Sequence, residues 1–302
     1  MSKKTVKIGM IGLDTSHVPA FTELLNNKDH PHYVEGGEVV VAFPGGSDDF
    51  ELSYSRVEGF TNQLRNDFGI TIVNSIAEVA EACDAILLES VDGRAHLEQF
   101  RQVAPYGKPV FVDKPLTTSH KDALEIARLA KEHNVPIMSC SAVRYSEALT
   151  EVLANEEGGG VTGFDCFGPM SIEPQLPGLY WYGIHTVDML YRVLGQGCVT
   201  VTAVTTETHD VITGEWADGR LGVIRGNRTG NWKFGGVLHR ENDTVAFDAS
   251  AHAKPFYASM MTHIIAMFQG EQPNIAFDET IEMMRFIEAA NESRETGKPV
   301  KL

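Results

Sequence analysis

The chain has 302 residues, 43% of them hydrophobic and 22% charged, which is enough for two domains or one large domain with a substantial core. Its formal net charge of −16 argues against binding nucleic acid or an anionic membrane over a broad surface, although a local cluster of N–H groups can still hold an anionic cofactor. No stretch is apolar enough to span a membrane and the start lacks a convincing signal peptide, so a cytoplasmic location is expected.

The first half of the chain alternates short apolar segments with helical patterns. Strands are predicted at residues 6–11, 38–43, 71–73, 85–88, 110–112 and 135–142, and helices at 18–25, 53–68, 76–82, 96–106 and 121–133. Such alternation implies right-handed crossovers between parallel strands. Residues 1–143 are therefore predicted to form a doubly wound α/β domain of the Rossmann type, built on a parallel sheet.

The pattern of apolar and polar residues changes after residue 143. Helical patterns at 147–153, 184–194, 257–268 and 279–294 surround β-rich stretches at 199–206, 219–225, 232–239 and 244–248. Polar alternation in these stretches is typical of an antiparallel sheet with one covered face. Residues 144–302 are therefore predicted to form an α+β domain with a largely antiparallel open sheet.

A degenerate nucleotide-binding motif lies between the first strand and the first helix. The place of the fingerprint Gly-x-Gly-x-x-Gly is taken by Gly12-Leu13-Asp14-Thr15-Ser16-His17, which retains only the first glycine. A carboxylate about 4 Å from a phosphate would cost roughly 4 kcal/mol at an effective dielectric of about 20. Asp14 is therefore expected to point away, or the usual pyrophosphate position is not used.

Other groups at this loop can still hold an anion. The helix N-terminus and the hydroxyls of Thr15 and Ser16 are suitable donors, so all six residues are candidate cofactor contacts. The acid that normally binds the adenosine ribose is missing, because Phe43-Pro44-Gly45 ends the second strand and Asp48 and Asp49 follow late.

A lysine follows the predicted strand at 110–112. Asp113 and Lys114 come at its carboxyl end, where open α/β sheets place their ligands, and Pro115 holds Lys114 in an extended conformation. Lys114 is therefore a candidate catalytic residue, and the alternative is a solvated loop lysine.

A histidine and an acid lie about one turn apart on a predicted helix of the second domain. His185 can take a proton from a substrate hydroxyl, and the alternative is a core histidine hydrogen-bonded to Asp188. Tyr180 and Trp181 precede them and can stack on a sugar ring, although aromatic packing in the core is the more common explanation.

These motifs together resemble one family. Asp-Lys-Pro-Leu-Thr at 113–117, the pattern of Gly183, His185 and Asp188, and the tail at 293–300 resemble the Gfo/Idh/MocA oxidoreductases, named for glucose–fructose oxidoreductase and inositol dehydrogenase. Arg144, within residues 141–145, resembles the arginine of the family's crossing into its second domain. The resemblance covers nearly the whole chain in order, and the loop at 12–17 is its weakest part.

The resemblance implies a set of roles. It implies an NAD or NADP cofactor bordered by Asp113 and Pro115, and a sugar, cyclitol or related polyol as substrate. Lys114 would contact the reacting oxygen and His185 would be the acid/base beside Asp188, with Arg144, Tyr180 and Trp181 at the substrate. Trp181 replaces an acid of the family pattern. The family often assembles through the second-domain sheet, so a homo-oligomer is expected.

Two other functions stay open beside the dehydrogenase. The altered positions Asp14, His17, Pro44 and Trp181 are also consistent with a relative that binds a ligand without catalysis. A redox-assisted glycosidase or lyase with a retained nicotinamide resembles known branches of the family. The four cysteines lack zinc-ligand spacing, and a zinc or iron hydrolase requires His17 and His185 to converge with Asp14. No metal site is expected.

Overall fold

The computed structural model describes residues 5–302, which divide into two compact units. The first unit runs to residue 117 and also contains residues 121–140 and 257–277. The second unit contains residues 118–120, 141–256 and 278–302. The division differs from a single boundary after residue 143, because the segment at 257–277 groups with the first unit.

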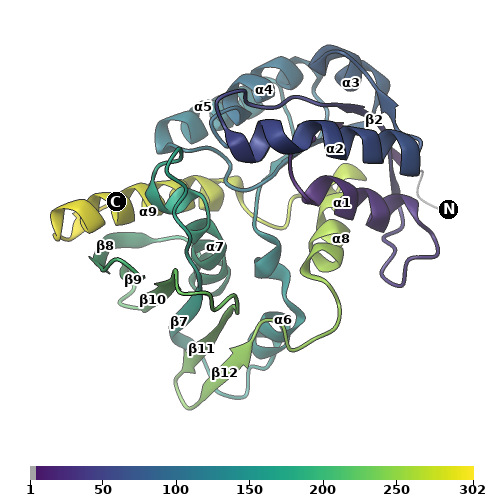
Figure 1. The fold of residues 1–302 in the computed structure, drawn as a ribbon. Helices are drawn as coiled ribbons and strands as arrows, with labels where there is room; N and C mark the ends of the chain where they lie inside the picture. The colour runs from purple at the N-terminus through teal and green to yellow at the C-terminus, as the bar shows by residue number, and fades with distance from the viewer. Residues whose placement is uncertain (1–4) are drawn as a thin grey trace. The chain divides into compact units, whose positions relative to one another are not determined.

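The first unit is built on a six-stranded parallel sheet (Figure 1). Its strands are β1 (Val6–Ile11), β2 (Gly37–Phe43), β3 (Thr71–Ile72), β4 (Ala85–Leu88), β5 (Val110–Val112) and β6 (Ile137–Met138). Their order is β3-β2-β1-β4-β5-β6, which is the doubly wound nucleotide-binding order. Every residue of β4 and β5 is buried, as expected for strands covered on both faces. The predicted fold class is confirmed.

Helices connect these strands. They are α1 (His17–Asn26), α2 (Glu51–Asp67), α3 (Ile76–Ala82), α4 (His96–Val103) and α5 (His120–Glu132), and α8 (Phe256–Phe268) joins them from later in the chain. Two glycines admit α8: a Cβ at Gly37 would lie 2.5 Å from Cδ1 of Ile265, and Gln269 donates a hydrogen bond to the carbonyl of Gly36. The helix predicted at 96–106 ends earlier, since a 3₁₀ turn covers Ala104–Tyr106.

The second unit contains a seven-stranded sheet in the order β12-β11-β7-β10-β9-β8-β13. The strands are β7 (Val161–Pro169), β8 (Cys198–Thr205), β9 (His209–Trp216), β10 (Leu221–Asn227), β11 (Gly235–Arg240), β12 (Thr244–Asp248) and β13 (Val300–Lys301). The pair β7 and β10 is parallel and the other pairs are antiparallel, so the prediction of a largely antiparallel sheet is confirmed.

One face of this sheet is covered by helices. The helices of the unit are α6 (Glu147–Ala154), α7 (Gly183–Leu194) and α9 (Phe277–Thr296), with 3₁₀ turns at Ala142–Tyr145 and Gly178–Tyr180. Figure 1 shows α7 beside β7 and β10. The Tyr191 ring of α7 meets Trp216 of β9 at 5.7 Å and Phe286 of α9 at 5.8 Å. Aromatic side chains of β9, α7 and α9 therefore pack together in one core.

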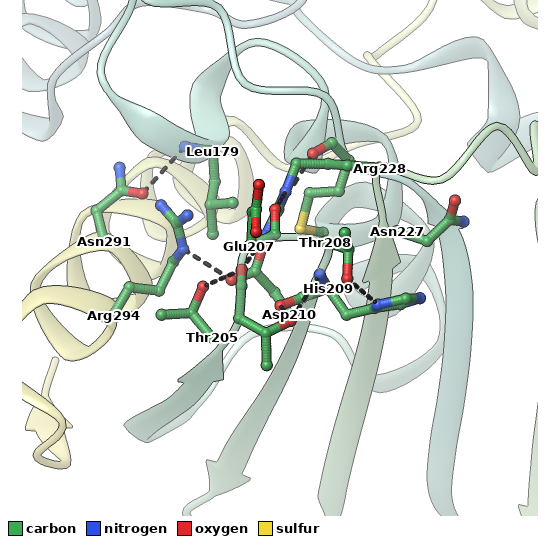
Figure 2. Close-up of polar contacts among 12 residues, drawn as sticks. Leu179, Thr205, Glu207, Thr208, His209, Asp210, Asn227, Arg228, Asn291 and Arg294 are labelled. Carbon is green, nitrogen blue, oxygen red and sulfur yellow. Dashed lines mark hydrogen bonds and ion pairs between the residues drawn. The ribbon is translucent and has the colours of Figure 1, made fainter.

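A buried acid ties three parts of the second unit together (Figure 2). Asp210 of β9 has no exposed surface and forms ion pairs with Arg228, which follows β10, and with Arg294 of α9. Burial alone would raise the pKa of Asp210, but hydrogen bonds from Thr205, Arg228 and Arg294 outweigh it and hold that pKa below its ordinary value.

All four cysteines of the chain are buried and carry free thiols. Across residues 5–302, no helix combines the length and the apolar character that crossing a membrane requires.

Candidate active site

The loop between β1 and α1 is a tight turn that requires its glycine. Gly12 adopts φ = +87°, and a Cβ there would lie 2.3 Å from the Ser90 hydroxyl oxygen. The amides of Gly12 and Leu13 donate to the carbonyls of Phe43 and Pro44, at 3.1 and 2.7 Å. The first glycine of the fingerprint thus keeps its usual turn-forming role.

Asp14 points into the protein. Its carboxylate accepts hydrogen bonds from the Ser53 hydroxyl at 2.6 Å and from the Val91 amide at 2.8 Å, and it has no exposed surface. Burial raises the pKa of Asp14 above its ordinary value, although these hydrogen bonds oppose the change. Asp14 therefore joins the β1–α1 loop to the first turn of α2 and to the β4–α4 loop, and it points away from the anion position as expected.

The rest of the loop is only partly available for contacts. Leu13 and Thr15 are buried and Ser16 is exposed. Ser16 takes the N-cap position of α1, but among the described residues its side chain makes no capping hydrogen bond. His17 is the first residue of α1, and its Nδ1 donates to Asp113 Oδ2 at 2.8 Å.

The lysine after β5 lies in a turn that is fixed on both sides. Before it, the Asp113 carboxylate is held by His17. After it, His96 Nδ1 lies 3.0 Å from the Pro115 carbonyl oxygen, while His96 Nε2 contacts the Ser90 carbonyl at 2.8 Å. Lys114 itself is 9% exposed, so it is not the solvated loop lysine of the alternative interpretation.

The pKa values of two acids near this lysine, Asp113 and Glu89, are shifted in opposite directions. Burial would raise the pKa of Asp113, but His17 and Lys114 outweigh burial and hold it at about 2. Burial raises the pKa of Glu89, at the end of β4, well above its ordinary value, and the charge of Asp113 adds to the effect. Adjacent carboxyls whose pKa values are pushed apart are typical of functional sites.

In the second unit, a serine holds the candidate acid/base. Ser141 Oγ lies 2.6 Å from His185 Nδ1, and the ring of His185 meets Tyr182 at 4.9 Å and Phe234 at 5.7 Å, both edge-on. The imidazole is therefore oriented through Nδ1 and through aromatic contacts. Ser141 is in turn fixed, because its amide donates to Asp188 Oδ2.

Comparisons with known proteins identify relatives of this chain. The family model described as an oxidoreductase family with an NAD-binding Rossmann fold, GFO_IDH_MocA, matches residues 6–140. The inositol 2-dehydrogenase 2 of Mycolicibacterium vanbaalenii is 23% identical over 202 residues, which cover 60% of this chain and 59% of that enzyme. Residues 6–140 therefore match the NAD-binding Rossmann domain of the Gfo/Idh/MocA oxidoreductase family.

Solved structures of inositol dehydrogenases share the fold over nearly the whole chain. A putative myo-inositol dehydrogenase from Sinorhizobium meliloti has a TM-score of 0.80 at 16% identity, with 98% of this chain and 99% of that chain covered. The myo-inositol dehydrogenase from Lactobacillus casei, in complex with NAD(H) and myo-inositol, has a TM-score of 0.78 at 16% identity, with 99% and 97% covered. The family resemblance drawn from the sequence is confirmed, and the first unit corresponds to the family's NAD-binding fold.

Some candidate substrate residues have structural partners instead. Arg144 is 7% exposed and pairs with Asp188 at 2.7 Å and with Glu279 at 2.6 Å. Tyr180 is 1% exposed and donates its hydroxyl to the Met284 carbonyl. These contacts favour core packing for both residues over the predicted contact with substrate. Trp181 is partly exposed, and its contact with a sugar stays a prediction.

Asp188 also differs from its expected arrangement. Its two carboxylate oxygens accept from the Ser141 amide and the Arg144 guanidinium, and burial raises its pKa. Ser141 therefore contacts both Asp188 and His185, and no sequence motif pointed to this residue. Glu89 was missed in the same way, although an acid directly after a buried strand was the available signal.

Proposed function

We propose that the chain is an NAD(P)-dependent dehydrogenase acting on a hydroxyl or carbonyl of a sugar, cyclitol or related polyol. The observation that carries this function is the position of Lys114 after the carboxyl end of β5 in the NAD-binding unit. The residues on either side are fixed, because His17 contacts Asp113 and His96 contacts the Pro115 carbonyl. The names of relatives and structural neighbours, which include inositol dehydrogenases, support a cyclitol-like substrate.

The nucleotide loop is compatible with the cofactor in spite of its altered residues. The Asp14 carboxylate is turned into hydrogen bonds with Ser53 and Val91, so the repulsion expected from an acid facing a pyrophosphate does not arise. A cavity of about 540 Å³ opens after β2, in the region where Rossmann folds bind the adenosine ribose. Its lining includes Asp48, which follows β2, and Arg65 of α2.

Asp48 is our candidate for the missing ribose acid. It lines this cavity, whereas Asp49 is engaged in an ion pair with Arg94. Gly12, Thr15, Ser16 and the first amides of α1 would hold the pyrophosphate. A bound nicotinamide supplies the hydride acceptor or donor, and the protein supplies orientation and proton transfer.

Lys114 would hydrogen-bond the reacting oxygen with its ammonium group. Its positive charge lowers the pKa of a substrate hydroxyl and so favours loss of the proton. His185 would take that proton at Nε2, since Nδ1 is held by Ser141. Asp113 would orient Lys114, and Trp181 would border the sugar.

A substrate screen tests this function. The protein is incubated with NAD⁺ or NADP⁺ and a panel of inositols, sugars and polyols, while nicotinamide absorbance and product are both recorded. A dehydrogenase forms reduced nicotinamide and oxidised product in equal amounts. Product with unchanged absorbance would instead identify a redox-assisted lyase or glycosidase, and absence of product with every compound would favour a non-catalytic ligand-binding relative.

A further inference from the structure

Three metal-ligating side chains converge at the carboxyl edge of the first sheet. His17 opens α1, Glu89 follows β4 and Asp113 follows β5, so residues far apart in sequence meet within one unit. One ligand atom from each lies within 4.8 Å of the other two. Nδ1 of His17 and Oδ2 of Asp113 are 2.8 Å apart, a separation that two ligands of one ion can adopt.

Glu89 is the member of this cluster whose burial the surrounding contacts do not explain. It has no exposed surface, and within residues 5–302 neither of its carboxylate oxygens has a hydrogen-bond partner. Buried polar groups are almost always hydrogen-bonded, and an unsatisfied one costs about 1–3 kcal/mol or more. Glu89 lies near a histidine and another carboxylate, and its missing partner therefore indicates a bound group that contacts its oxygens.

The charges around the cluster also favour a cation. Glu89 and Asp113 bring two carboxyl groups to the cluster, and the basic residue Lys114 follows Asp113 directly. Asp14 adds a further carboxylate on one side, where Arg56 faces it. Three carboxyl groups therefore lie near two basic groups, so an added cation has more acidic than basic neighbours.

We propose that His17, Glu89 and Asp113 form a binding site for a divalent transition-metal ion of the zinc or manganese class. One imidazole nitrogen with two carboxylates suits these ions, whereas Mg²⁺ and Ca²⁺ prefer ligand sets made of oxygen alone. Three protein ligands leave at least one coordination position for water or a bound molecule.

The surroundings of His17 hold its ring ready for such a role. The imidazole stacks on Phe21 at 5.3 Å and meets the Tyr257 ring edge-on at 5.0 Å. Its side chain retains 12% exposure, which leaves a path for an ion into a cluster whose carboxylates are otherwise buried. Aromatic packing of this kind fixes a ligand before the ion binds.

This site shares His17 and Asp113 with the proposed cofactor contacts, and its metal binding is tested without dinucleotide or substrate so that the two proposals can fail independently. Full-length protein is freed of metal with a chelator and titrated calorimetrically with Zn²⁺, Mn²⁺ and Mg²⁺. The expected result is about one Zn²⁺ or Mn²⁺ per chain, with Mg²⁺ bound at least about tenfold more weakly. Glu89→Gln and His17→Gln should each weaken Zn²⁺ binding by about tenfold or more.

His252→Gln is the matched control. His252 is an exposed histidine of the second unit that contacts Glu151 at 2.9 Å, so its loss removes a surface His–carboxylate pair and leaves the proposed site intact. Circular dichroism checks that each variant is folded. Equal Zn²⁺ affinity of wild type, Glu89→Gln and His17→Gln would overturn the site, as would loss of binding only in His252→Gln.

A spectroscopic measurement on the wild type keeps the test independent of the variants. Co²⁺ substituted into the site should show visible absorption from a low-symmetry set of nitrogen and oxygen ligands, and one equivalent of Zn²⁺ should abolish it. Absence of a Zn²⁺-sensitive Co²⁺ spectrum would contradict the assignment.

Discussion

At the scale of single residues, two altered positions of the fingerprint make contacts near Lys114. His17, which stands where the third glycine is expected, holds Asp113, the residue before the lysine. Asp14, which stands at the second glycine, holds the Val91 amide after β4. His96 reaches from α4 to the carbonyl after the lysine. Residues that depart from the pattern therefore help to position the one that matches it.

Lys114→Ala is expected to lower the turnover number by about 10²–10⁴-fold, because it removes the charge at the reacting oxygen. Because Lys114 is buried beside Asp113 and Glu89, circular dichroism and the thermal unfolding temperature are measured to check that the variant is folded. Lys121→Ala is the control, because Lys121 is exposed on α5. Initial rates with the best substrate of the screen measure the effect, and an unchanged rate in Lys114→Ala would exclude the proposed role.

Ser141→Ala is expected to reduce the turnover number about tenfold while the KM for substrate stays near its wild-type value. The reason is that His185 loses the contact that fixes Nδ1, whereas the binding groups remain. Ser146→Ala is the matched control: Ser146 also accepts a backbone hydrogen bond, from Leu149, at the start of α6. Rates that fall equally in both variants would point to a general loss of stability.

The site could be predicted from the sequence only where a motif is local. Lys114 and His185 come from short contiguous patterns, and the structure surrounds both with fixed partners. Glu89 and Ser141 lie near site residues that are 24 or more positions away in the sequence, so no local spacing pattern could predict them. The same distance explains why the His17 and Asp113 contact was not expected.

At the scale of elements, the buried strands and amphipathic helices follow from their apolar periodicity. The strand predicted at 135–142 is the informative exception, since β6 covers only Ile137–Met138. The chain leaves the sheet there and the Ser141 amide donates to Asp188, a tertiary contact that overrides the local β pattern. β7 and β9 were missed because glycines and polar residues interrupt their alternation, as Gly163 and Gly168 do in β7.

Asp210→Asn is expected to destabilise the second unit by about 3 kcal/mol near neutral pH, because it leaves Arg228 and Arg294 without their buried counter-charge. Asp218→Asn, in an exposed ion pair with Arg220, should change stability little. Urea unfolding of the three proteins measures the difference.

The pH dependence of that difference has a definite sign. The folded-state pKa of Asp210 lies below its ordinary value, and the unfolded value is about 3.9. Its contribution is therefore fully present above about pH 4 and is lost as pH falls through the folded pKa. The gap between wild type and Asp210→Asn should narrow in that acid range, and a constant gap would show that the carboxylate charge is not responsible.

At the scale of the whole molecule, we propose a homo-oligomer that forms through the outer face of the second sheet. Val204 of β8 is 68% exposed and Leu221 of β10 is 51% exposed, while the opposite face of the same strands is buried. Exposed apolar side chains on an open sheet favour a partner surface.

Val204→Glu combined with Leu221→Glu should shift the protein toward smaller species in size-exclusion chromatography with light scattering. Leu124→Glu, which places the same charge at an exposed apolar position on α5, should leave the mass unchanged. A wild-type mass of one chain, 33.2 kDa, would contradict assembly altogether.

The most direct test of the central claim is a calorimetric titration of cofactor-stripped protein with NAD(H) and NADP(H). It is run on metal-free protein and repeated with Zn²⁺, so that a missing ion is not mistaken for a missing cofactor site. We predict micromolar binding of at least one dinucleotide, because the Gly12 turn, the withdrawn Asp14 carboxylate and the cavity after β2 together accommodate it. Absence of binding at millimolar concentration in both titrations would contradict the dehydrogenase function.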